Sequence, residues 1–196
     1  LDAQLRKDMC IELKRLQKTV GISFVHVTHN QEEAMSVADR IAIIADGEMI
    51  EQGTPKEIYS NPRKKFTAEF IGEKNIFNGK ILEFTKEKII VYIDGVSIEV
   101  ANNNYNIIKN QNVSLSIKSE SIQITKDKDT KPENQKNSIK GNVSEITFLG
   151  QFVRYLVLLN SGQEIQVRSY EEVNYISLND AVKLSWKIED FLLHES

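Results

Sequence analysis

Residues 25–34 read Val-His-Val-Thr-His-Asn-Gln-Glu-Glu-Ala, where an apolar run turns polar and leads directly into a helix start. The run over 22–28 is short, rich in β-branched residues and not strictly alternating, which is typical of a strand covered on both faces. The pattern therefore predicts a buried parallel strand over 22–28. His29 then lies at the carboxyl end of this strand, where open α/β sheets bind ligands, and beside a helix N-terminus, which attracts phosphate.

Helix signals lie on both sides of the predicted strand. An amphipathic helix over 3–18 is indicated by apolar residues at three- and four-residue steps: Leu5, Met9, Leu13 and Leu16. Gly21 is expected to end this helix, because glycine adopts the left-handed conformation of a helix C-terminus without strain. After the strand, Asn30 and Glu33 have the spacing of a capping box and predict a helix through Ala38.

A hairpin and two short helices are predicted next. Residues 41–45 are apolar and form a strand, and Asp46-Gly47 is a tight-turn signal before a return strand over 48–52. Thr54-Pro55-Lys56-Glu57 combines an N-cap, a proline at N1 and a glutamate at N3, which together start a helix. Asn61-Pro62 predicts one more helix, expected to bury three apolar side chains: Phe66, Phe70 and Ile71.

From about residue 75 the pattern changes to short alternating strands. These are expected over 77–84, 88–93, 96–100, 113–117, 121–125, 139–149, 152–160, 163–168, 182–187 and 190–194. Many short strands with turn signals predict a small barrel or sandwich. The polar segment 126–138 is predicted to be an exposed loop between two β groups, which could be two halves of one β domain. The change of pattern puts a domain boundary near 73–76.

Composition narrows the class of protein. The chain has 196 residues and no apolar run near the roughly 18 residues of a membrane span. The polar start carries no signal peptide, and the single Cys10 excludes an internal disulfide, fits a reducing cytosol and is expected to be structural. A net charge of -3 argues against nucleic-acid binding driven by phosphate neutralisation. We predict no nucleic-acid partner and no metal site.

Several segments of the first part, in order, resemble one protein family. Leu1-Asp2, followed by Ala3-Gln4-Leu5-Arg6, resembles the end of a D-loop, and Val27-Thr28-His29 with residues 31–34 resembles an H-loop. The order continues with Ala38-Asp39-Arg40-Ile41, Asp46-Gly47, Gly53-Thr54-Pro55, Ile58-Tyr59 and Asn61-Pro62. This arrangement is similar to the end of the nucleotide-binding domain in ATP-binding-cassette (ABC) importer ATPases. The resemblance implies that residues 1–74 are the C-terminal part of such an ATPase domain.

Residues 75–196 resemble the transport-associated OB (TOBE) domain that follows the ATPase in these importers. The segment 70–79 is most similar to the junction in spermidine/putrescine importer ATPases, and Gly141–Ile146 with Leu149-Gly150 resembles the family's second segment. The sequence Lys118-Ser119-Glu120-Ser121 departs from the family's Arg-Pro-Glu step. The expected fold class is therefore an α/β fragment, the C-terminal part of an ABC nucleotide-binding domain, followed by an all-β OB-like (TOBE) barrel or sandwich.

The resemblance assigns roles to two residues. It makes His29 the switch histidine, which hydrogen-bonds a γ-phosphate oxygen and orients the attacking water, and phosphoryl transfer depends mostly on such positioning. It puts Asp2 at a dimer interface near the partner's nucleotide. The alternatives are a polar histidine at a helix start for His29 and an N-cap for Asp2. Many relatives have Asp where this chain has Asn30, and Asn caps a helix about as well.

The other titratable candidates are expected to have structural roles. Glu32 and Glu33 could be an acid/base pair, but stabilisation of a helix N-terminus explains them more simply. His26, inside the predicted strand, is expected to be a packing residue, and His194, near the C-terminus, is expected to be exposed.

The printed sequence lacks the nucleotide-gripping motifs of the family. It has no G-x-x-x-x-G-K-[ST] loop, no Leu-Ser-Gly-Gly-Gln-type segment and no Walker B carboxylates. The chain alone is therefore expected neither to bind ATP tightly nor to hydrolyse it. ATP and Mg²⁺ are the expected ligands of a longer parent subunit.

Two functions remain open from the sequence. In the first, the parent subunit hydrolyses ATP to drive uptake of a solute, a polyamine such as spermidine or putrescine. Its expected partners are transmembrane permease subunits, a solute-binding protein and a second copy in a homodimer at the cytoplasmic face of the cell membrane. In the second, the chain is a stand-alone OB-like regulatory or ligand-binding module without ATPase activity.

Overall fold

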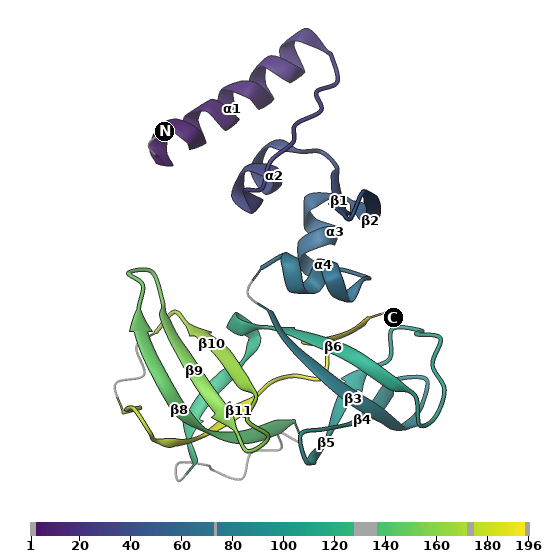
Figure 1. The fold of residues 1–196 in the computed structure, drawn as a ribbon, viewed down its shortest axis with the longest axis vertical. Helices are drawn as coiled ribbons and strands as arrows, with labels where there is room; N and C mark the ends of the chain where they lie inside the picture. Colours follow the sequence, from purple (N-terminus) through teal and green to yellow (C-terminus); the bar gives the residue numbers. More distant parts are fainter. Residues whose placement is uncertain (1–2, 73, 128–136, 172–174, 195–196) are drawn as a thin grey trace. The chain divides into compact units, whose positions relative to one another are not determined.

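The computed structural model describes residues 3–72, 74–127, 137–171 and 175–194. The chain divides into two compact units, residues 1–71 and residues 72–196 (Figure 1). The first unit holds the α-helices and one hairpin, and the second holds two five-stranded sheets. Of the helices described, none is both long and apolar enough to cross a membrane.

The first unit opens with the predicted amphipathic helix. Helix α1 spans Ala3–Val20, and Gly21 follows it with φ +72° and donates its N–H to the Gln17 carbonyl at 2.9 Å. This is the left-handed ending that glycine adopts without strain, so the predicted helix and its stop are confirmed. Cys10 is buried on α1, as expected.

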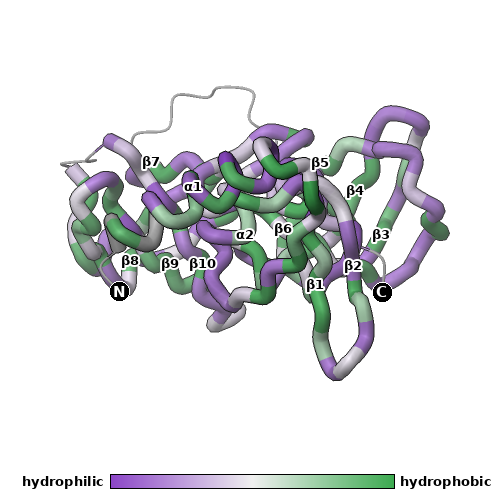
Figure 2. Tube along the Cα trace, turned by 90° about the horizontal axis from the view of Figure 1, so that it is seen from above, coloured by the Kyte–Doolittle hydropathy of each residue, from purple (hydrophilic) through white to green (hydrophobic). Residues whose placement is uncertain are grey.

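The predicted hairpin and capped helix are also present. Strands β1 (Ile41–Ala45) and β2 (Glu48–Gly53) pair antiparallel across Asp46-Gly47, and β1 is green along its length in Figure 2. Helix α3 (Pro55–Ser60) begins with a full capping box between Thr54 and Glu57. Between the hairpin and this helix lies a small core of Ile41, Ile43, Ile58 and Ile71.

The predicted parallel strand over 22–28 is wrong for the described structure. These residues are extended but pair with no strand among those described, and Val25 and Val27 are 94% and 91% exposed. A strand forms only where neighbouring backbone groups complete its hydrogen bonds. The β-branched, apolar composition of residues 22–28 suits a buried strand, but no described strand lies beside them to complete its hydrogen bonds.

The last helix of the first unit begins later than predicted. Helix α4 spans Lys65–Phe70, while Asn61 instead ends α3. The backbone N–H groups of Arg63 and Lys64 donate to the Glu51 carboxylate on β2, at 2.9 and 3.2 Å. The carboxylate of a neighbouring strand therefore takes the place of a local N-cap.

Burial in α4 was predicted correctly for one side chain of three. Ile71 is buried, but Phe66 and Phe70 are both exposed and stack on each other with ring centroids 6.0 Å apart. Phe66 and Phe70 are four positions apart, so their rings lie on one face of α4. This spacing is typical of the buried face of a helix, but both rings are exposed.

The second unit consists of antiparallel strands. Their bounds are β3 Lys74–Phe84, β4 Lys88–Ile93, β5 Val96–Ala101, β6 Asn112–Lys118, β7 Gln123–Lys126, β8 Ser138–Phe148, β9 Val153–Leu159, β10 Glu164–Ser169, β11 Ala181–Ser185 and β12 Phe191–His194. Each predicted strand of this part is present, with ends that differ by at most three residues. The polar loop predicted over 126–138 lies mostly outside the described residues, since 128–136 are not described.

The two sheets repeat one topology. Their orders are β12-β6-β3-β4-β5 and β7-β11-β8-β9-β10, so β3–β6 correspond to β8–β11. The long first strand of each half shifts register at the same place, between Ile81 and Glu83 and between Val143 and Glu145. Each half gives its last strand to the other half's sheet: β7 pairs with β11, and β12 pairs with β6.

Equivalent glycines let each long strand approach its neighbour closely. A Cβ at Gly79 would lie 2.9 Å from the Tyr92 carbonyl oxygen, and one at Gly141 would lie 2.7 Å from the Leu158 carbonyl oxygen. Backbone atoms this close cannot yield, so any larger residue would push the strands apart. Both long strands therefore need glycine at the equivalent position.

Two buried asparagines join the sheets at equivalent places. The Asn75 side chain donates to the Gln166 carbonyl at 2.8 Å and accepts the Gln166 N–H at 2.7 Å. The Asn137 side chain makes the same pair of bonds with Glu99, both at 2.7 Å. Each amide thus satisfies an edge strand, β10 or β5, that has no further strand to pair with.

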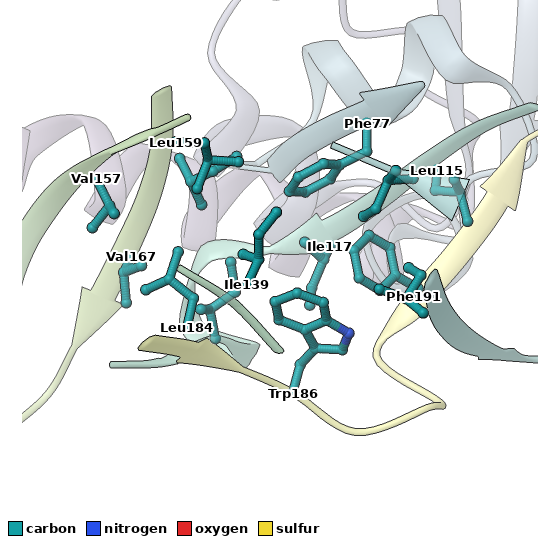
Figure 3. Packing of buried hydrophobic residues seen from close by; sticks show 14 of the residues in the cluster. Phe77, Leu115, Ile117, Ile139, Val157, Leu159, Val167, Leu184, Trp186 and Phe191 are labelled. Atoms are coloured by element: carbon teal, nitrogen blue, oxygen red, sulfur yellow. The ribbon is translucent and has the colours of Figure 1, made fainter. Parts of the chain in front are cut away.

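One continuous core fills the space between the two sheets (Figure 3). Phe191 of β12 makes edge contacts with Phe77 of β3 and with Trp186, at centroid distances of 5.5 and 5.3 Å. The prediction that His194 is exposed is wrong: it is buried, and its Nε2 lies 2.7 Å from the Ser116 Oγ. Pairing of β12 with β6 draws this C-terminal histidine inward.

We predict that Asn75→Ala destabilises the second unit by about 2 kcal/mol, because the buried Asn75 amide no longer makes its two hydrogen bonds to the half-buried N–H and C=O of Gln166. Urea unfolding measures the change. Asn78→Ala, on the same strand as Asn75, is the matched control. The Asn78 amide accepts an exposed bond from Ser114 of the neighbouring strand β6, so its loss should cost less than about 0.5 kcal/mol. Equal losses for the two variants would contradict the role given to Asn75.

Acid should weaken the α3 cap. Backbone and side-chain hydrogen bonds from Thr54 hold the pKa of Glu57 below its ordinary 4.5. A lowered folded-state pKa gives stability that is present above the unfolded pKa and lost as pH falls through the folded value. The stability difference between wild type and Glu57→Gln should therefore shrink between about pH 5 and about pH 3, as followed by thermal unfolding. A difference that is constant with pH would contradict the assignment.

Candidate functional site

The candidate site is built around the start of helix α2 (Gln31–Val37). Asn30 has the extended backbone of an N-cap, and its side chain accepts the Glu33 N–H at 3.2 Å. The predicted cap is confirmed. Asn30 places one amide dipole at the helix start, where the acidic residues Glu32 and Glu33 fill the first turn.

Thr28 closes a tight turn around the next residue. Its Oγ1 accepts the Asn30 N–H at 2.9 Å and donates to the Glu33 Oε2 at 2.6 Å. The capping box therefore differs from the predicted form. The Glu33 carboxylate reaches the Thr28 hydroxyl, and that hydroxyl, not the carboxylate, receives the N–H of the cap residue.

His29 lies at the tip of this turn and is exposed, whereas Thr28 and Asn30 on either side are half-buried. Throughout the described part of the chain the His29 imidazole forms no hydrogen bond or ion pair. An exposed imidazole beside a helix N-terminus can meet an anion from solvent without first breaking an internal bond. Asp2, the other predicted site residue, lies outside the described residues.

His26 belongs to the same cluster, which the sequence did not suggest. Its side chain is 43% exposed, and its Nε2 lies 3.6 Å from the Glu33 Oε2. The packing role predicted for His26 required a strand over 22–28, which is absent. The Glu33 carboxylate thus contacts both Thr28 and His26. These contacts give no support to an acid/base pair of Glu32 with Glu33.

Contacts from two other helices hold α2 in the first unit. The Lys14 Nζ on α1 donates to the Ser36 carbonyl at 3.2 Å, and the Gln31 side chain donates to the Phe70 carbonyl at the end of α4. Helix α2 is therefore held at both of its ends, with α1 contacting its last turn and the end of α4 contacting its first residue.

The described residues contain no group of three or more His, Cys, Asp and Glu side chains that could hold a metal ion.

Aromatic side chains of the second unit are distributed between core and surface. Tyr155 is buried, Phe148 and Tyr170 are exposed, and the Arg168 guanidinium lies 4.1 Å from the Phe152 ring centroid.

Comparison with protein-family models identifies one match. Residues 115–193 match the TOBE domain model. The match begins in β6 and ends in β12, so it covers the strands of the second half and the two strands that cross between the halves.

Curated relatives match both units. The spermidine/putrescine import ATP-binding protein PotA of Trichormus variabilis is 40% identical over 171 residues, which are 85% of this chain and 44% of the relative. The PotA protein of Fusobacterium nucleatum is 30% identical over 98% of this chain and 52% of the relative. That of Thermotoga maritima is 32% identical over the whole chain and 54% of the relative. The chain thus spans about half the length of these relatives.

A solved structure resembles the chain in fold. The cytoplasmic molybdate-binding protein ModG, crystallised with molybdate bound, aligns with a TM-score of 0.58 and 14% identity. The alignment covers 64% of this chain and 99% of ModG. At this identity the likeness concerns the fold, which is mostly β with two curled sheets, as an OB-like TOBE domain is expected to be.

Two replacements of Asn30 should show whether α2 needs a side-chain acceptor at its N-cap or needs asparagine itself. Asn30→Ala should weaken α2 by about 1 kcal/mol because the Glu33 N–H loses its acceptor, and Asn30→Asp should preserve the cap. Amide hydrogen exchange at Glu33 and Ala34 measures the difference. Faster exchange in Asn30→Asp than in Asn30→Ala would be incompatible with this cap.

Proposed function

This chain belongs with the C-terminal regions of ABC importer ATP-binding subunits and carries a TOBE domain, and from this we propose how its two parts act. Residues 1–74 form the C-terminal part of the ATPase domain, including its H-loop. Residues 75–196 form the TOBE regulatory and dimerisation domain. One observation carries the proposal: relatives of a single type match along 85% or more of the chain, through both units.

In this proposal His29 is the switch histidine. It hydrogen-bonds a γ-phosphate oxygen of ATP and orients the attacking water. Two features support this role: the imidazole is exposed, and it lies beside the positive end of α2. Phosphoryl transfer depends on positioning and charge stabilisation, which a hydrogen-bonding imidazole at a fixed place supplies.

In this proposal, the remaining ATP-binding residues lie in a part of the full-length subunit outside residues 1–196. The relatives are about twice as long as this chain, so their length accommodates a phosphate-binding loop, Walker B carboxylates and the Mg²⁺ ligands. Asp2 would belong to the D-loop at the homodimer interface, near the nucleotide of the partner copy. Mg²⁺ supplies charge stabilisation to the phosphates when it is bound.

The exposed apolar side of the first unit supports the presence of such a covering half. Val25 and Val27 are almost fully exposed, and α1 exposes apolar residues along one face: Leu5, Met9, Leu13, Leu16 and Val20. Large exposed apolar areas mark surfaces that another polypeptide segment covers. The extended segment 22–28 would then pair as a strand in the complete ATPase domain.

The solute proposed for the importer is a polyamine, spermidine or putrescine, because the relatives that match are import proteins for these solutes. The subunit would work with transmembrane permease subunits and a solute-binding protein, as a homodimer on the cytoplasmic face of the membrane. Its ATP hydrolysis would drive uptake.

We predict that His29→Ala in the full-length subunit lowers kcat for ATP hydrolysis about 100-fold, because one transition-state hydrogen bond is lost. Its urea unfolding should match the wild type, since the His29 side chain is exposed. Residues 1–196 alone should show neither ATP binding by calorimetry nor ATPase activity. Full activity of His29→Ala, or equal activity of the chain alone and the full-length subunit, would overturn the proposed function.

A further inference from the structure

We propose that Thr28 and Glu33 are positioning residues for His29: they close the turn that carries the imidazole and set its place before nucleotide arrives. The inference rests on the function proposed for His29. It adds two residues that act through the backbone of His29 and make no contact with the substrate themselves.

The turn is closed by bonds on both sides of His29. The Thr28 Oγ1 accepts the Asn30 N–H at 2.9 Å, which spans the residue between them. The Asn30 side chain in turn accepts the Glu33 N–H at 3.2 Å. His29 is therefore enclosed by an i to i+2 hydrogen bond whose far end is fixed to the first turn of α2.

Glu33 fixes the Thr28 hydroxyl. A free hydroxyl rotates among staggered positions and would hold the Asn30 N–H only part of the time. Its bond to the Glu33 Oε2, at 2.6 Å, is charge-assisted and orients the lone pairs of Oγ1 toward the turn. The Glu33 side chain is 18% exposed, so this bond is partly shielded from competing water.

A cap alone does not need this arrangement. The capping box at α3 uses the same residue types, and there the Glu57 carboxylate accepts the N–H of its own cap residue Thr54 directly, at 2.8 Å. At α2 the carboxylate is directed instead to Thr28, one residue before His29. This arrangement keeps α2 capped through Asn30 and also constrains the backbone of His29.

The test is kinetic and uses the full-length subunit. Thr28→Val keeps the shape of the side chain but removes the hydroxyl, and Glu33→Gln removes the charge that orients it. Both should lower kcat for ATP hydrolysis at least about 10-fold with KM for ATP within about twofold, since a misplaced group costs transition-state stabilisation. Thr28→Ser keeps the hydroxyl and should restore kcat to within about twofold of wild type.

The α3 capping box supplies matched controls. Thr54→Val and Glu57→Gln make the same chemical changes at a helix start that carries no histidine, and they should leave kcat unchanged. If the Thr28 and Thr54 variants lose activity equally, the effect is general loss of capping and the proposal is overturned. It is overturned as well if Thr28→Val keeps wild-type kcat.

A second measurement does not depend on activity. Hydrogen exchange of the Asn30 amide in the same subunit, without nucleotide, should be at least about 10-fold faster in Thr28→Val and normal in Thr28→Ser, because this amide loses its acceptor. Unchanged exchange would overturn the proposal. His29→Ala separates the two hypotheses: if it retains full activity, the function proposed for His29 fails, and if it alone is inactive, only the positioning role of Thr28 and Glu33 fails.

Discussion

Exchange of terminal strands is the constraint on which the second unit depends. Strand β7 leaves the first half to pair with β11, and β12 leaves the second half to pair with β6. Neither five-stranded sheet is complete without a strand from the other half. A single core follows from this exchange, because Phe191 on the donated β12 packs against Phe77 of the receiving sheet. The halves therefore fold as one cooperative body, although each repeats the topology of the other.

Most of the second unit could be predicted because antiparallel strands carry their burial pattern in the sequence. Alternation of apolar and polar residues along β3 to β6 and β8 to β11 indicated where strands run. The repeat was not recognised from the sequence, because identical pairs such as Gly79 and Gly141 are separated by equivalent positions whose side chains differ. Asn75 and Asn137 perform the same task, but Ile117 and Trp186 fill equivalent core positions with very different volumes. Topology and hydrogen bonding are repeated where residue identity is not.

The first unit was harder to predict, for a different physical reason. Three local signals were confirmed, since Asn30 caps α2, Thr54 and Glu57 form their box, and Gly21 ends α1, whereas the helix start at Asn61-Pro62 was wrong. Signals that depend on a distant partner failed, since an apolar segment over 22–28 can be a strand only where another strand meets it. The Thr28–Glu33 bond was also missed. It joins a residue outside the helix to one inside it, so neither helical nor strand periodicity indicates it.

The segment 22–28 and the Thr28–Glu33 hydrogen bond share one residue, Thr28. The extended segment with its exposed valines ends at Thr28, and Thr28 is the residue that Glu33 ties to the first turn of α2. A strand pairing with residues 22–28, as proposed for the complete ATPase domain, would therefore act on the end of the segment that precedes His29. Because the Thr28 hydroxyl accepts the Asn30 N–H at 2.9 Å and donates to the Glu33 carboxylate at 2.6 Å, a displacement of Thr28 would pass to the turn and to the first turn of α2. In that proposal, strand pairing and the position of the imidazole would be coupled through Thr28.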